Sequence, residues 1–196
     1  MDYAASDIDL RLIERFARGD QAAFDALVSR HRRAVFNLVH RMVGDREAAE
    51  DVTVEVFFQA YLSLPGFRRQ AKFGTWLHRI AINVCLQHLR RPRIKQASAE
   101  VPLIEGQLPL GRDIAELILS RGSVAQVIAA MQELSSTQRA AVIMHYLDGR
   151  AFAEIAEILE IPTNTAKTRV FHGTKALRDK LRALGILPAS RKKGAS

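Results

Sequence analysis

Residues 151–181 read AFAEIAEILEIPTNTAKTRVFHGTKALRDKL, a short apolar helical pattern followed by a turn and a longer basic pattern. Small and apolar residues recur at helical spacing over 152–159, Pro162 interrupts the run, and a second helix is predicted from about 164 to 183. This arrangement is typical of a helix-turn-helix, whose second helix begins with short polar side chains that can reach base edges, beside cations that can hold phosphates. The residues of this kind are Asn164, Thr165, Lys167, Thr168 and Arg169. An amphipathic hairpin with a solvated basic face is the alternative interpretation.

Helical periodicity also dominates the rest of the chain, and no alternating strand pattern is found. Asp20, Asp45 and Ser135 precede helical runs and can act as N-cap residues. Further helices are predicted over 7–18, 20–44, 45–64, 75–91, 113–134 with a break at Gly122, and 137–147. We therefore expect an all-α fold of two helical bundles joined by a flexible linker. The expected domains are 1–92 and 113–187, with the linker at 93–112 and a basic tail at 188–196.

The composition excludes several classes of protein. The 196 residues include 29 Lys and Arg, 21 Asp and Glu, and one cysteine, Cys85. A single cysteine forms no internal disulfide, and the sequence has no C-x-x-C pair, so disulfide scaffolds and structural zinc modules are not expected. No apolar run reaches the roughly 18 residues that cross a bilayer, so we expect a cytoplasmic protein without membrane insertion. The net charge of +8 favours a polyanionic partner.

The charge is concentrated in zones of opposite sign. Residues 65–99 hold eight Lys or Arg and no acid, and residues 163–196 hold nine Lys or Arg and one acid. Residues 45–55 are acidic instead, and Asp51 and Glu55, at i and i+4, lie on one face of the predicted helix. A solvated face or a salt bridge within the bundle is the ordinary interpretation of such a pair. The zones nevertheless indicate surfaces that meet different partners.

Residues 64–83, LPGFRRQAKFGTWLHRIAIN, interleave aromatic side chains with basic ones. Unstacked bases need flat apolar surfaces and a cationic groove for the backbone, which this segment could supply. Phe73 and Trp76, taken singly, are more simply explained as core residues, and Asn83 as a surface amide. The six histidines are scattered, and no Walker-type or G-x-G-x-x-G loop is present, so no catalytic residue, metal site or cofactor is predicted.

Several separated motifs, taken together, resemble the extracytoplasmic-function (ECF, group IV) sigma factors of the sigma-70 family. The motifs are DQAAF (20–24), AEDVTVEVF (49–57), FGTWLHRIAIN (73–83), LRR (89–91), EIAEIL (154–159) and TAKTR (165–169). The resemblance implies that the first bundle is a sigma-2 domain whose acidic helix binds core RNA polymerase at the beta-prime clamp helices. The residues concerned are Asp51, Val54 and Glu55, where Val54 replaces a usual Gln. The beta subunit and an anti-sigma factor are further implied partners.

The resemblance also assigns both basic zones to promoter DNA. In the minus-ten element, a non-template base is flipped into a pocket involving the 67–72 loop and Asn83, and cations hold the strand. The residues implied are Phe67, Arg68, Arg69, Lys72, Trp76, Arg79, Asn83, Arg90 and Arg91. In the minus-thirty-five element, a sigma-4 recognition helix enters the major groove. The residues implied are Thr163, Asn164, Thr165, Lys167, Thr168, Arg169, Phe171 and His172.

Besides Val54, three departures from the family pattern fall in the second bundle. Glu160 and Asn164 stand where Gly is usual, and His172 stands where Arg is frequent, so Glu160 is expected to adopt a positive φ angle or to change the turn. The sequence thus predicts a sigma factor that directs promoter-specific initiation. A free-standing helix-turn-helix regulator is the alternative, but it would need neither the acidic helix nor the aromatic-basic loop.

Overall fold

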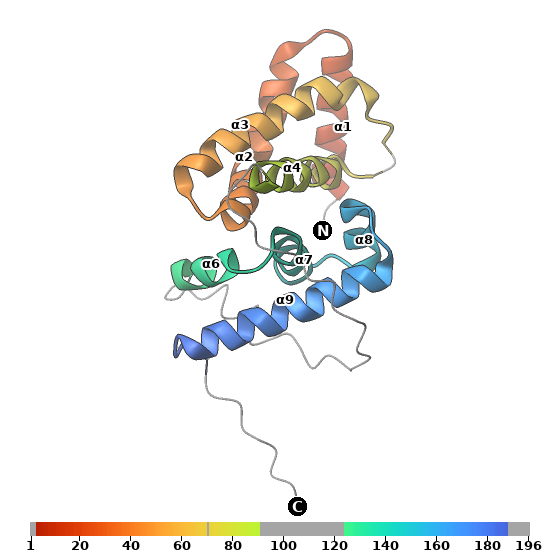
Figure 1. Ribbon diagram of the computed structural model, residues 1–196. Coiled ribbons are helices and arrows are strands. Elements are labelled where there is room, and N and C mark those ends of the chain that lie inside the picture. Colours follow the sequence, from red (N-terminus) through yellow and green to blue (C-terminus); the bar gives the residue numbers. More distant parts are fainter. Residues whose placement is uncertain (1–2, 70, 91–123, 188–196) are drawn as a thin grey trace, which may run out of the picture. The chain divides into compact units, whose positions relative to one another are not determined.

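The computed structural model describes residues 3–69, 71–90 and 124–187, and the chain divides into two compact units, Met1–Arg93 and Ile94–Ser196. Every regular element in the described residues is helical, which confirms the all-α prediction (Figure 1). The predicted linker at 93–112, the basic tail at 188–196 and the predicted helical stretch over 113–123 lie outside the described residues.

The first unit consists of α1 (Tyr3–Ala17), α2 (Gln21–Val43), α3 (Arg46–Ser63), the short 3-10 turn η1 (Leu64–Gly66) and α4 (Phe73–Arg90). Its core forms where α2, α3 and α4 contact one another, with α1 packed on α2 (Figure 1). The fully buried aliphatic side chains there come from all three helices and include Leu27, Val39, Met42, Val56, Leu77 and Ile82. In α2 and α3 the buried residues follow the predicted 3.6-residue periodicity. In α4 the buried face instead includes Phe73 and Leu77, whereas Trp76, Ile80 and Leu89 of the predicted stripe are only partly buried.

Asp45 and Asp20 both stand at the predicted N-cap positions, of α3 and α2, but only Asp45 caps its helix through the side chain. Asp45 accepts a hydrogen bond of 2.8 Å from the backbone N–H of Ala48, as predicted for an N-cap. The Asp20 side chain makes no cap hydrogen bond, because its carboxylate accepts one from Nε of Arg15 at 2.9 Å instead. This hydrogen bond from Arg15 lowers the pKa of Asp20. The Asp20 backbone thus keeps the extended N-cap conformation, while its side chain bonds to Arg15 and not to the first turn of α2.

The second unit consists of α6 (Val124–Gln132), α7 (Ser136–Tyr146), α8 (Phe152–Leu159) and α9 (Thr163–Ala183). Ser135 caps α7 as predicted, and it forms a capping box with Gln138. The long helix α9 packs along both α7 and α8 (Figure 1). Gly173 allows the closest of these approaches, because a Cβ built there would lie 2.8 Å from Cγ2 of Val142 and 3.2 Å from the carbonyl oxygen of Gln138.

The turn between α8 and α9 depends on Glu160, which has φ 54° and ψ 48° in the left-handed region. The expected positive φ is therefore confirmed. In this conformation the backbone N–H of Glu160 bonds back to carbonyl oxygens of Ala156 and Glu157, which ends α8. Most non-glycine residues pay about 1–2 kcal/mol for this conformation. The turn is consequently a strained point in an otherwise regular helix-turn-helix.

We predict that Gly173→Ala lowers the free energy of unfolding of the second unit by about 1–3 kcal/mol, because α7 and α9 must separate to admit the methyl group. Chemical denaturation followed by circular dichroism measures the change. Gly66→Ala is the control, since a Cβ there meets nothing within 4 Å and φ is not positive. Equal stability of Gly173→Ala and the wild type would contradict the close approach of the two helices.

We predict that Glu160→Gly raises the free energy of unfolding by about 0.5–1 kcal/mol, because glycine relieves the left-handed strain. Thermal unfolding measures the shift. Ala153→Gly, at an exposed position inside α8, is the matched control and should destabilise by about 1 kcal/mol. If both glycine substitutions destabilise alike, the turn is not strained at Glu160.

Candidate nucleic-acid and partner interfaces

The outward face of α3 carries the acidic pair together with apolar side chains. Asp51 and Glu55 are exposed, and Val54 between them is 70% exposed, whereas Val52 and Val56 point into the core. The structure therefore places the three predicted partner-binding residues on one accessible face. Glu55 also accepts a hydrogen bond of 2.8 Å from the Gln59 side chain.

Two large apolar residues on this face were missed by the sequence analysis. Phe58 is 55% exposed and Leu62 is 56% exposed. Phe58 lies one helical turn after Val54, and Leu62 lies one turn after Phe58. The i, i+4, i+8 spacing was a signal that could have revealed them. We refer to Val54, Phe58 and Leu62 as the α3 apolar stripe. An apolar stripe with carboxylates beside it has the composition of a protein-binding surface with a polar rim.

An aromatic cluster lies where η1, the following loop and α4 meet. The ring centroids of Phe67, Phe73 and Trp76 are 5.1–6.1 Å apart in pairs. Phe73 is only 3% exposed, so it is a core residue, while Phe67 and Trp76 remain partly accessible. Phe73 thus supports the cluster from the core, and the rings of Phe67 and Trp76 keep accessible surface on which another ring could stack.

The cations predicted to contact the minus-ten strand are distributed along this segment. Arg68, Arg69 and Lys72 are exposed in the loop, and Arg79 is partly exposed on α4. Arg69 has a positive φ of 56° and pairs with Oε1 of Glu14 on α1 at 3.0 Å.

The two predicted minus-ten residues further along α4 are both exposed, namely Asn83 and Arg90. Arg90 ends α4, roughly 25 Å along the helix axis from Phe73. It is therefore not brought together with the aromatic cluster. Arg91 lies outside the described residues.

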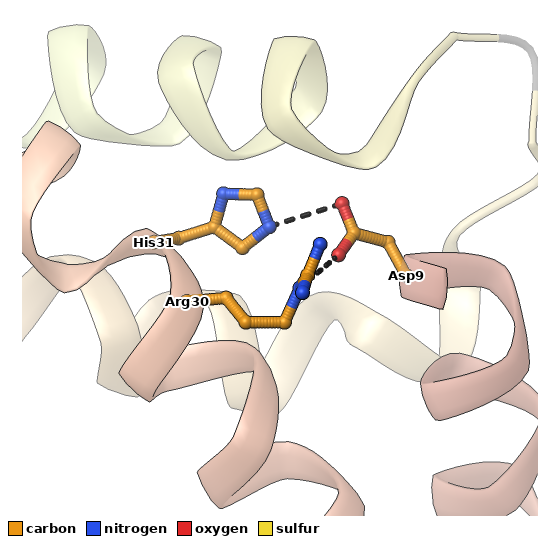
Figure 2. A network of polar contacts seen from close by, with 3 residues as sticks. All are labelled: Asp9, Arg30 and His31. Carbon is orange, nitrogen blue, oxygen red and sulfur yellow. Dashed lines mark hydrogen bonds and ion pairs between the residues drawn. The ribbon is translucent and has the colours of Figure 1, made fainter. Parts of the chain in front are cut away.

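A network of polar contacts centred on the buried Asp9 carboxylate joins α1 to α2 (Figure 2), and its His31 ring lies 5.1 Å from the Phe73 ring of the aromatic cluster. Asp9 of α1 is 5% exposed, and its two carboxylate oxygens contact Nε of Arg30 and Nε2 of His31, both at 3.0 Å. Figure 2 shows the two α2 side chains converging on this carboxylate. The sequence analysis missed this network, because Arg30 and His31 lie 21 and 22 residues after Asp9 and no local motif indicates that they meet.

The start of α9 presents the polar residues predicted to contact the minus-thirty-five element. Thr163, Asn164 and Lys167 are exposed, while Thr165, Thr168, Arg169, Phe171 and His172 are partly exposed. Spacings of three and four residues place Asn164, Thr168 and Phe171 on one face of the helix, and Thr165, Arg169 and His172 on the neighbouring face. These residues therefore do not all point in one direction.

Three of these side chains are constrained by their surroundings. The hydroxyl of Thr168 donates to the carbonyl oxygen of Asn164 at 2.9 Å. Partial burial lowers the pKa of Arg169, although a guanidinium remains charged at neutral pH. Nε2 of His172 is buried and has no hydrogen-bond partner among the described residues. The ring of His172 is nevertheless partly exposed, so its predicted contact with DNA stays a prediction.

The described residues contain no group of three or more His, Cys, Asp or Glu side chains arranged to hold a metal ion. Within the same described ranges, no helix combines the length and apolar character needed to cross a bilayer.

Family models match both units. The model for Sigma-70 region 2 matches residues 27–93, and that for Sigma-70 region 4 matches residues 124–177. Among solved structures, CnrH in complex with the cytosolic domain of CnrY covers 90% of this chain and 98% of its own, with a TM-score of 0.64 and 23% identity. The sigma factor RpoE in complex with the anti-sigma factor NepR from Bartonella quintana gives a TM-score of 0.60 at 21% identity, covering 81% of this chain and 96% of its own. These two similarities support the fold.

Similar curated proteins extend over nearly the whole chain. The ECF RNA polymerase sigma factor SigW of Bacillus subtilis is 33% identical over 179 residues, which are 88% of this chain and 96% of SigW. The RNA polymerase sigma-H factor of Pseudomonas aeruginosa is 35% identical over 184 residues, 90% of this chain and 95% of that protein. The ECF RNA polymerase sigma-E factor of Escherichia coli is 34% identical over 183 residues, which are 90% of this chain and 95% of that protein. With both regions matched in order and relatives similar along almost their full length, the chain belongs to the ECF sigma factors of the sigma-70 family.

Proposed function

We propose that the protein is a promoter-specificity subunit that binds core RNA polymerase, recognises minus-thirty-five and minus-ten elements, and directs transcription initiation. In this proposal the sigma-2 domain comprises residues 1–92 and the sigma-4 domain residues 113–187, with the linker at 93–112 and the basic tail at 188–196. The observation that carries the proposal is the combination within one unit of an acidic-apolar face on α3 and an aromatic-basic segment before and along α4. A free-standing helix-turn-helix regulator would need neither, and the relatives support the sigma factor function.

Core polymerase binding is assigned to Asp51, Val54 and Glu55, with the α3 apolar stripe extending the contact toward Leu62. The exposed apolar side chains would be removed from water on binding, which contributes about 25 cal/mol per Å² of apolar surface. Carboxylates beside the stripe would contribute more to partner choice and association rate than to affinity. Val54, which offers no hydrogen bond, would act through packing. The proposed target is the clamp helices of the beta-prime subunit, with the beta subunit as a further contact.

Minus-ten recognition is assigned to the 67–72 loop and α4. Phe67 and Trp76 offer partly accessible rings for an unstacked base, and the exposed Arg68, Arg69 and Lys72 lie beside them to hold phosphates. Base stacking worth about 1–3 kcal/mol per base would offset the cost of unstacking a nucleotide from the duplex. Capture of a base without chemistry on it requires no catalytic group, so the subunit by itself is proposed not to be an enzyme.

Minus-thirty-five recognition is assigned to the start of α9 in the major groove. Asn164 and Thr168 can reach base edges from one face, and Lys167 can hold a phosphate. The function places the protein in the cytoplasm with polymerase. An anti-sigma factor is a further proposed partner, since the similar RpoE structure contains the anti-sigma factor NepR.

We predict that Asp51→Arg or Glu55→Arg weakens binding to core polymerase about tenfold or more, because it places a cation where the partner is expected to be basic. Fluorescence anisotropy of labelled protein titrated with purified core measures the affinity. Asp25→Arg makes the same charge change at an exposed position of α2 and should leave the affinity nearly unchanged. Equal losses at the α2 and α3 positions would argue against α3 as the binding face.

We predict that Asn83→Ala reduces promoter opening about tenfold while leaving core binding intact, because the amide is proposed to bind the flipped base. Permanganate reactivity of unpaired thymines measures the opening. Gln87→Ala removes another exposed amide one turn further along α4 and is the matched control. Parallel loss of opening and core binding in Asn83→Ala would exclude this role.

A further inference from the structure

The contacts of Asp9 with Arg30 and His31 connect α1 to the segment proposed to capture the minus-ten strand, which consists of the 67–72 loop and the start of α4. Asp9 is buried, and a buried carboxylate is stable only when its oxygens are paired. Arg30 and His31 each satisfy one oxygen at 3.0 Å (Figure 2). Because side chains from two helices meet at one carboxylate, the position of His31 is fixed by α1 as well as by its own helix.

His31 also touches the start of α4. Its ring lies edge-on to Phe73, with centroids 5.1 Å apart. A Cβ built on Gly74 would lie 3.8 Å from Cε1 of His31, so the ring also lies against the first turn of α4. Phe73 in turn supports Phe67 and Trp76 at 6.1 and 5.5 Å. A continuous series of contacts therefore runs from Asp9 through His31 to the partly exposed rings.

A second link joins α1 to the same segment from the surface. Glu14 pairs with Arg69 at 3.0 Å, and Arg69 has the left-handed backbone conformation that persists only where its surroundings hold it. This pair is exposed and contributes little by itself. It nevertheless adds a second point of attachment, so the segment is held at Arg69 by α1 and at Phe73 by His31 of α2.

We propose that Asp9 and His31 are positioning residues for single-strand capture, so that α1 belongs to the promoter-opening machinery although it precedes the region matched by the Sigma-70 region 2 model. The proposal rests on the proposed function. Asp9 holds the His31 ring, the ring holds Phe73, and Phe73 holds Phe67 and Trp76 in place before DNA arrives. Aromatic rings that are held in place in advance lose less conformational entropy when they stack on a base.

The test uses the full chain with purified core polymerase and three substitutions. Asp9→Asn removes the charge with little change of shape, and His31→Phe keeps a ring against Phe73 but cannot donate to Asp9. Arg30→Gln is the matched control, because Arg30 pairs with the same carboxylate and has no ring contact with Phe73. For each variant, anisotropy gives the affinity for core, and then the affinity of saturated holoenzyme for a labelled single-stranded minus-ten oligonucleotide. The oligonucleotide is taken from a promoter that the wild-type protein opens.

We expect Asp9→Asn and His31→Phe each to weaken oligonucleotide binding about tenfold, the loss typical of a charge-assisted hydrogen bond, without weakening core binding. The variant that carries both Asp9→Asn and His31→Phe should bind the oligonucleotide no more weakly than whichever single variant binds it more weakly. The losses are not expected to add, because both residues act through one series of contacts. Arg30→Gln should lower the melting temperature but bind the oligonucleotide as the wild type does.

Wild-type oligonucleotide affinity in both variants, additive losses in the double variant, or an equal loss in Arg30→Gln would overturn the proposal. A loss of core binding that parallels the loss of oligonucleotide binding would overturn it as well, because it would indicate general destabilisation. Failure of the proposed function is distinguishable, since the wild-type protein would then open no promoter before any variant is compared.

Discussion

Burial of one face of each of α2, α3 and α4 in a shared core is the constraint on which the rest of the first unit depends. An amphipathic helix in a small unit has neighbours on one side only, so its other side remains in water. In α3 the buried side holds Val52 and Val56, and the free side holds Asp51, Val54 and Glu55. Packing that stabilises the fold therefore also presents the proposed polymerase-binding face, without any loop or moving part.

The proposed DNA surfaces are likewise positioned by residues that also stabilise the fold. Phe73 is at once a core residue and the support for the accessible rings of Phe67 and Trp76. In the second unit, Gly173 allows α9 to lie close to α7, and α9 still presents Asn164 and Lys167 at its start. The net charge of +8 therefore hides a division into two basic zones proposed to face DNA and an acidic face proposed to meet a protein.

Local sequence signals predicted the helices well, because caps, turns and periodicity depend on neighbours within a turn or two. The cap at Asp45, the capping box at Ser135 and the positive φ of Glu160 are of this kind. For the candidate site, local signals predicted that Asp51 and Glu55 share one face of a helix, whereas the roles of the site residues stay predictions. Asp20 stands at the predicted N-cap position, but its expected side-chain bond to α2 is absent because the carboxylate accepts from Arg15 instead. The exposure of Phe58 could not be predicted in this way, because it depends on which face of α3 packs against α2 and α4. Helical periodicity indicates which face is more apolar, but it does not exclude an aromatic ring on the exposed face.

Contacts between distant segments could not be predicted from local patterns. Asp9 meets His31 across 22 residues, and neither residue belongs to a recognisable motif. The buried Nε2 of His172 likewise depends on how α9 packs, and not on its place in a recognition helix.

Transcription reconstituted from purified core polymerase, this protein and a library of promoter fragments shows whether the protein directs promoter-specific initiation. We expect transcripts that depend on the protein and start downstream of two shared sequence elements, with permanganate-reactive thymines in the minus-ten element. Absence of a stable complex with core, together with absence of promoter-dependent transcripts, would contradict it.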